Sequence, residues 1–391
     1  MNLSVILKDP FRFFFPLGVL TGVLGVGLWL PLAWGDVSSY PIRAHQLIMV
    51  GGFLLTFVVG FLTTAVPRFT STKFLREWEF SLLVPGLLAA LYYGFIAHVP
   101  GHFGAVVFTL SVLIVFVLRR FRNRDENPPY TFLFVGAGLG LWWAGSLVLS
   151  LAPIVHFVSE VVPPARAIYN HGALLCLVIG VGGRLVPGML GWRKRVKQQR
   201  DRYENAGSLR EAVPAAVWGA VVVFVVSYLL EGRLDSRVLW SIRAAVMVYV
   251  GMGYWNLHRF PRERTGFTWG IWVAGWSFVI GLWVPVLWPG GGVHGFHTIF
   301  IGGFSLLTIL VATRVTLAHG TEGKELESSS WILKFLIGLF VLAMMTRVSA
   351  AIWPGAYLSH LGYAALAWIV GVVLWGLILL PRMVTDFEEP A

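Results

Sequence analysis

The chain has 391 residues, of which 57% are hydrophobic and 13% are charged. Soluble globular domains carry about 25% charged residues, so this composition excludes an ordinary soluble domain. The net charge of +11 would suggest nucleic-acid binding in a soluble protein. Here the basic residues lie between apolar stretches, which makes them topology signals of a membrane protein. We therefore expect a lipid bilayer as the chain's partner and no nucleic acid.

Twelve apolar stretches without period-2 alternation predict an all-α, polytopic transmembrane bundle of about 12 helices, forming a single transmembrane domain over residues 1–391. Most stretches have the ~20 residues that cross about 30 Å of hydrocarbon. The fourth is predicted to be the shortest. In chain order, the predicted spans are residues 11–32, 44–66, 80–99, 103–118, 131–153, 167–190, 212–230, 238–257, 267–288, 294–318, 331–352 and 357–380.

Basic residues concentrate in one alternating set of connections, chiefly residues 68–76, 119–124 and 193–210. The connections on the opposite side of the membrane hold few basic residues. The positive-inside rule then predicts that both termini are cytoplasmic. No Asp or Glu lies inside any predicted span, which counts against a proton-coupled transporter or pump.

This orientation places most histidines at the outer side of the membrane. His45, His171 and His297 fall in the first turns of the second, sixth and tenth spans and are equally spaced in sequence. The spacing predicts three pseudo-repeated four-helix units, each presenting one histidine on its second helix. Coincidence is the alternative.

Neutral imidazole is a good ligand for haem iron and for copper, and histidines buried in a membrane are costly enough to need a reason. We therefore predict that His45, His171 and His297 are cofactor ligands. His294 lies three residues before His297, on the same helical face, and is a further candidate. Simple placement at the membrane interface is the preferred interpretation of the remaining outer histidines: His98, His102, His156 and His360.

Four arginines lie at or near the outer ends of spans: Arg43, Arg166, Arg243 and Arg347. A haem held by outer histidines would place its propionates there, where arginine can pair with them. Ordinary snorkelling of arginine at helix ends is the alternative.

Several motifs resemble those of one family, the NnrS proteins. Residues 9–12 resemble the DPFR that opens these proteins, and residues 43–46 resemble their His-Ala-His-Glu entry to span 2. Residues 182–187 resemble their GGRxxP at the end of span 6, and residues 297–320 resemble their span-10 pattern. The second motif departs from the family, because Arg43 and Gln46 replace its first histidine and its glutamate. His319, in the last motif, is a further candidate metal ligand.

This resemblance implies a bacterial inner-membrane protein of nitric oxide metabolism and nitrosative-stress protection, containing haem b and copper. A looser similarity, of fold level only, is to the twelve-helix subunit I of haem–copper oxidases and nitric oxide reductases. It implies that His45 and His297 are an axial pair and that His171 binds copper or a second haem. Span 7, however, has no histidine.

The leading hypothesis is therefore a haem protein that binds or reduces nitric oxide. As an enzyme it would be a nitric oxide reductase-like oxidoreductase, supplied with electrons by a quinol or a cytochrome. One alternative is a transporter for a metal or a small solute. Another is a haem-based sensor or assembly factor without turnover.

Overall fold

The computed structural model describes residues 2–36, 38–127, 129–155, 160–192, 197, 201, 211, 213–320, 326–327 and 331–385. A short helix, α1 (Leu3–Lys8), precedes the spans. The spans are α2 with α3 (Phe11–Gly27, Trp29–Ala33), α4 with η1 and α5 (Ile42–Leu47, Ile48–Leu54, Leu55–Thr70), α6 (Glu77–Phe95), α7 (Val99–Arg122), α8 (Phe132–Leu151), α9 with η3 and α10 (Val162–Ala167, Ile168–Gly172, Ala173–Met189), α13 (Ala215–Leu229), α14 (Ser236–Gly253), α15 (Gly266–Leu287), α16 with η5 and α17 (Gly292–His297, Thr298–Ser305, Leu306–Ala318), α19 (Trp331–Ser349) and α20 (Tyr357–Thr385).

This order confirms the predicted all-α membrane bundle, and each predicted span corresponds to one of these helices or helix groups. Within the described residues, ten are long and apolar enough to cross a membrane. The other two are α13, with 15 residues, and α14, with 18. The fourth span was wrongly predicted to be the shortest, since α7 has 24 residues. Proline is tolerated in the first turn of a helix, so Pro100 begins α7 instead of delaying it, and arginines extend its other end.

The prediction that spans contain no acidic residue was wrong at α6. This helix begins at Glu77, three residues before the predicted span, because acidic side chains stabilise the first turn of a helix. Glu79 is fully buried and forms an ion pair with Arg120 of α7. The predicted span begins at the first apolar residue of the stretch, Phe80, whereas the helix begins about one turn earlier, at Glu77.

The chain divides into two compact units: unit 1 is Met1–Phe61 with Glu263–Ala391, and unit 2 is Leu62–Arg262. The division falls inside α5. It neither tests the single-domain prediction nor follows the predicted three-fold repeat. One feature does favour the repeat: each of the three histidine segments has a short α-helix, then a π-helical segment, then a longer α-helix.

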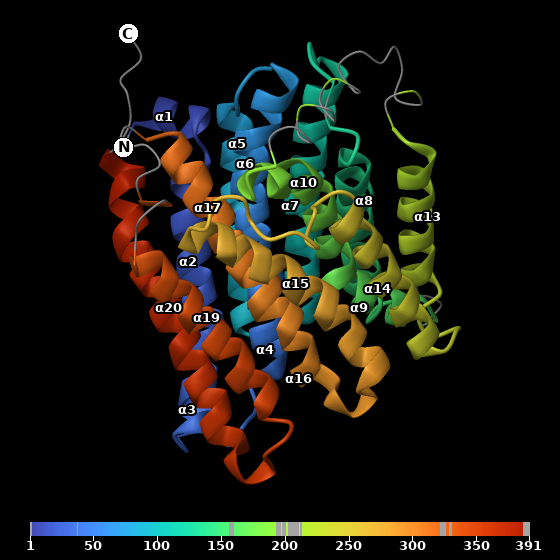
Figure 1. The fold of residues 1–391 in the computed structure, drawn as a ribbon, viewed down its shortest axis with the longest axis vertical. Helices are drawn as coiled ribbons and strands as arrows, with labels where there is room; N and C mark the ends of the chain where they lie inside the picture. Colours follow the sequence, from blue (N-terminus) through green and yellow to red (C-terminus); the bar gives the residue numbers. More distant parts are fainter. Residues whose placement is uncertain are drawn as a thin grey trace. The chain divides into compact units, whose positions relative to one another are not determined.

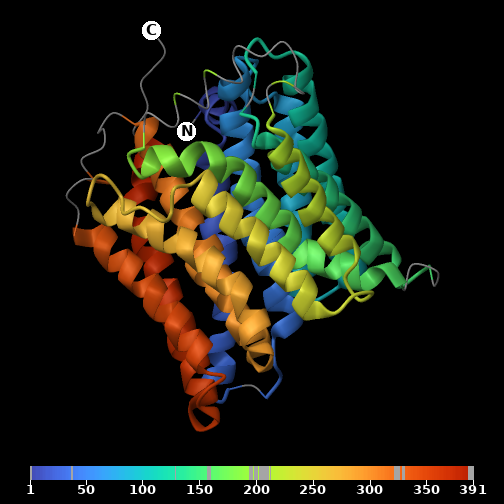
Figure 2. The ribbon, with the colours of Figure 1, turned by 45° about the vertical axis from the view of Figure 1, so that its right-hand side comes forward.

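Within unit 1, α19 and α20 lie side by side, and α2 packs against both η1 and α20 (Figure 1). The second view shows the neighbouring α19 and α20 at the orange-to-red end of the colour scale (Figure 2). Small residues allow α2 to approach closely: a Cβ on Gly22 would lie 2.7 Å from Trp368 Cη2 and 2.8 Å from Phe53 Cδ2. Gly18 and Gly22 thus serve close packing inside the chain.

Arg12 joins three chain segments at one end of unit 1. Its guanidinium pairs with Asp9 at 3.3 Å and donates hydrogen bonds of 3.0 Å to the carbonyls of Met383 and His319. The start of α2 and the ends of α17 and α20 therefore meet at the same end. This is the arrangement expected if spans 1, 10 and 12 alternate in direction as predicted.

The close approach at Gly22 gives a testable consequence. We expect Gly22→Ala to destabilise the protein by about 1–3 kcal/mol, because the added methyl overpacks two buried aromatic rings. Gly27→Ala is the matched control: it lies in the same helix, and a Cβ there meets nothing within 4 Å. Thermal unfolding in detergent measures both. Equal midpoints for the two variants would contradict the packing assigned to Gly22.

Candidate haem site and family membership

Two of the predicted ligands, His45 and His297, lie in unit 1 in matching local structure. His45 is in α4, just before the π-helical segment η1, and His297 ends α16, just before η5. π-helical turns are uncommon and occur frequently at functional sites. Two histidines that are far apart in sequence therefore occupy equivalent places in unit 1, each just before a π-helical segment.

Both rings are oriented by backbone carbonyls. His45 Nδ1 lies 2.9 Å from the carbonyl oxygen of Gly25, and His297 Nδ1 lies 2.6 Å from that of Val293. A carbonyl oxygen can only accept, so in each ring Nδ1 carries the proton and Nε2 presents its lone pair. This is the tautomer of a metal-ligating histidine, whose other nitrogen is held by a second partner. Among the described residues, neither Nε2 has a hydrogen-bond partner.

Arg347 lies near the end of α19, against His294 of α16. Its side chain is buried and contacts His294 Nδ1 through Nη1. His294 also lines a cavity of about 680 Å³ together with Tyr357 and Ser359. Binding sites for small ligands span about 300–1,000 Å³. Arg347 itself does not line this cavity, so its predicted pairing with an acidic group of a cofactor stays a prediction.

The other two predicted residues of unit 1 lie apart from this group. Arg43 is in α4, two residues before His45, with an exposed side chain. His319 follows α17, so the whole of η5 and α17 separates it from His297. Its Nδ1 lies 2.7 Å from the carbonyl of Val315. The structure does not bring His319 to the other candidate ligands.

His171 lies in unit 2, within η3, and is buried. Its Nδ1 is 3.0 Å from the hydroxyl of Tyr228, and its ring packs against Trp240 with centroids 5.1 Å apart. The guanidinium of Arg243 stacks on Tyr228, 3.9 Å from the ring centroid. The predicted ligand therefore lies in a group with three side chains from α13 and α14: Tyr228, Trp240 and Arg243.

Arg243 is fully buried and has an ion pair of 2.5 Å with Glu231. It also donates a hydrogen bond of 2.6 Å to the carbonyl of Ser227. Its Nη1 is buried and has no partner among the described residues, so this atom is the one available to a propionate. Arg166, by contrast, is exposed in α9. Its predicted role stays a prediction.

A buried pair that the sequence did not indicate joins His102 and Tyr169 in unit 2. His102 Nδ1 donates to the carbonyl of Ala90 at 2.8 Å, so Nε2 accepts from the Tyr169 hydroxyl, also at 2.8 Å. His102 is fully buried. Its interpretation as an interfacial histidine was therefore wrong; the available signal was Pro100, which is tolerated in the first turn of α7 and so allows the helix to start before the predicted boundary. His156 lies outside the described residues.

The two histidines offer a donor that haem proteins use. Neutral imidazole nitrogen is a ligand of haem iron, whose other donors come from the porphyrin. Each ring has Nδ1 fixed on a carbonyl and an Nε2 without a hydrogen-bond partner among the described residues. The part of the chain that the structure describes has no group of three or more His, Cys, Asp or Glu side chains that could hold a metal ion.

Two of the family-like motifs have clear packing roles. Asp9 and Arg12 form the buried ion pair described above. Gly182 and Gly183 allow α10 to approach the indole of Trp255 and the side chain of Thr131, where a Cβ would clash. Thr131 in turn donates a hydrogen bond of 2.7 Å to the carbonyl of Gly180. These motifs therefore maintain the helix contacts within each unit.

Comparison with known proteins agrees with these motifs. The family model described as "NnrS protein" matches residues 5–386, nearly the whole chain. No curated protein matches the sequence. The length of the match, together with the multi-pass helical fold, shows that this chain belongs to the NnrS family of nitric oxide-related membrane proteins.

Proposed function

We propose that this protein holds haem b between His45 and His297 and uses it to bind or reduce nitric oxide. The observation that carries the proposal is the tautomer that the two rings share, each with Nδ1 fixed on a backbone carbonyl and Nε2 available. An imidazole held in this way loses little freedom when it coordinates iron. Family membership supports the link to nitric oxide.

Each part of the site has a definite task. Bound haem would supply an iron centre for one-electron chemistry, and nitric oxide would bind there in place of one of the two histidines. Gly25 and Val293 hold the ligand tautomers through their carbonyls, and Arg347 supplies positive charge for a propionate.

The wider proposal keeps the sequence-based topology. The basic connections favour cytoplasmic termini in a bacterial inner membrane. A quinol or cytochrome would then supply electrons from the membrane or its outer side. His171 is the proposed ligand of copper or of a second haem, with Tyr228 orienting its ring.

The test uses the full-length protein purified in mild detergent. We expect stoichiometric haem b by pyridine haemochrome, and a shift of the reduced Soret band when nitric oxide is added anaerobically. A nitric oxide electrode with a reduced quinol then separates an enzyme, which consumes the gas over many turnovers, from a sensor or assembly factor, which binds it once. A purified protein that contains no haem and takes up none when haem is added would refute the proposal. Uptake of a metal by lipid vesicles that contain the protein would favour a transporter.

A further inference from the structure

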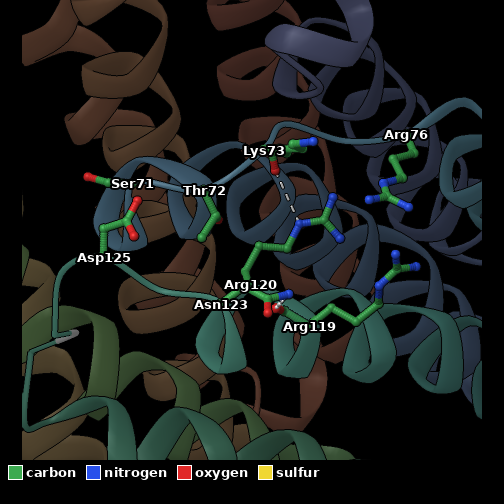
Figure 3. A pocket seen from close by; sticks show the side chains of 8 residues that line it. All are labelled: Ser71, Thr72, Lys73, Arg76, Arg119, Arg120, Asn123 and Asp125. Atoms are coloured by element: carbon green, nitrogen blue, oxygen red, sulfur yellow. Dashed lines mark hydrogen bonds between the residues drawn. The ribbon is translucent and has the colours of Figure 1, made fainter.

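A second candidate site lies in unit 2, at the end of α6 and α7 opposite to His98. It is a cavity of about 390 Å³, between the segment that follows α5 and the last turn of α7. Figure 3 shows its eight lining side chains. They are Ser71, Thr72, Lys73, Arg76, Arg119, Arg120, Asn123 and Asp125. This end of the unit is the one predicted to be cytoplasmic.

The charges in this pocket are unevenly arranged. Asp125 and Ser71 lie at one side, whereas Arg76 and Arg119 lie at the other, with Lys73 and Arg120 between them (Figure 3). Arg120 is neutralised by Glu79. Lys73, Arg76 and Arg119 have no carboxylate partner among the described residues. The pocket therefore keeps an excess of positive charge on one side.

The cations are held in place by a buried anchor. Arg120 donates hydrogen bonds to the carbonyls of Lys73 at 3.3 Å and Phe74 at 2.7 Å. It also forms a two-point ion pair with Glu79, whose second oxygen accepts from the Arg76 backbone N–H at 2.9 Å. Both Arg120 and Glu79 are buried. The segment carrying Lys73 and Arg76 is thus fixed against α7 before any ligand arrives.

We propose that this pocket binds a phosphate group. Two guanidinium groups and an ammonium group that face one cavity provide the geometry with which proteins recognise phosphate oxygens. The pocket's volume lies within the range of small-ligand sites. The phosphate would come from an anionic lipid headgroup or from a soluble phosphate. Exposed Phe74, Trp78 and Leu82 beside the pocket would accommodate an acyl chain, which favours the lipid source.

Binding to the full-length protein tests the proposal with two kinds of phosphate. Native mass spectrometry compares phosphatidylglycerol with diacylglycerol, which lacks phosphate, and thermal unfolding compares sodium phosphate with sodium chloride at equal ionic strength. The variants are Arg76→Gln and Arg119→Gln, with Arg122→Gln as the control. Arg122 is an exposed cation in the same last turn of α7 but does not line the pocket.

We expect Arg76→Gln and Arg119→Gln each to weaken binding about fivefold, and Arg122→Gln to leave it unchanged. An effect seen only with phosphatidylglycerol assigns a lipid headgroup, and an effect seen only with sodium phosphate assigns a soluble ligand. Equal weakening by Arg122→Gln, or no dependence on phosphate, would overturn the proposal. If a variant misfolds, Lys73→Gln provides the same comparison, because the Lys73 side chain is exposed and, within the described part of the chain, only the residue's backbone carbonyl is hydrogen-bonded.

Discussion

Replacing His297 with alanine is expected to abolish stable haem binding while the helices still form. The substitution removes one of the two proposed haem ligands, and the side chain's only hydrogen bond within the described residues is to the carbonyl of Val293. His45→Ala should have the same effect, because the proposed site needs both imidazoles. Optical spectra of the purified variants measure the loss as the Soret absorbance per protein, and circular dichroism checks the helix content.

His360→Ala is the matched control for these variants. His360 lies in α20 of the same unit, and its Nδ1 is 3.0 Å from the hydroxyl of Ser349, so its loss also removes one hydrogen bond. We expect this variant to keep its haem. Imidazole added to His297→Ala should restore part of the Soret band, since it can occupy the vacated position. A full haem content in both His45→Ala and His297→Ala would exclude this axial pair.

Hydropathy was sufficient to predict the helices but not their ends. Each predicted span has a counterpart, because twenty apolar residues have few options in a bilayer other than a helix. Glu79 lay outside its predicted span because a charged first turn lowers hydropathy without ending the helix. The π-helical segments beside His45 and His297 were also absent from the prediction, since their sequences follow the same apolar pattern as an α-helix.

The candidate site was only partly predictable for a related reason. The histidines at helix starts and the nearby arginine could be predicted from topology, and Arg347 does contact His294 in unit 1. Their hydrogen-bond partners could not, because the carbonyl of Gly25 is presented to His45 by a different helix. Likewise, nothing in the sequence links His102 to Tyr169, which are 67 residues apart.

The largest effect on stability is expected for Glu79→Ala. Glu79 is fully buried, and its removal would leave the guanidinium of Arg120 buried without its counter-ion. Breaking one partner of a buried ion pair costs about 3–5 kcal/mol. Reversible denaturant unfolding in detergent, followed by tryptophan fluorescence, measures the change. Glu77→Ala is the matched control, since Glu77 is an exposed carboxylate in the same helical turn, and it should change stability little.

A double variant separates the ion pair from the other contacts of Arg120. If the pair acted only through its charges, Glu79→Leu with Arg120→Met would restore wild-type stability, because apolar replacements often match a buried pair. Arg120 also donates to the carbonyls of Lys73 and Phe74, which the double variant would leave without this donor. We therefore expect only partial recovery. Complete recovery of stability in the double variant would show that these two carbonyl contacts add nothing to stability. If Glu79→Ala were as stable as Glu77→Ala, the ion pair itself would not stabilise unit 2.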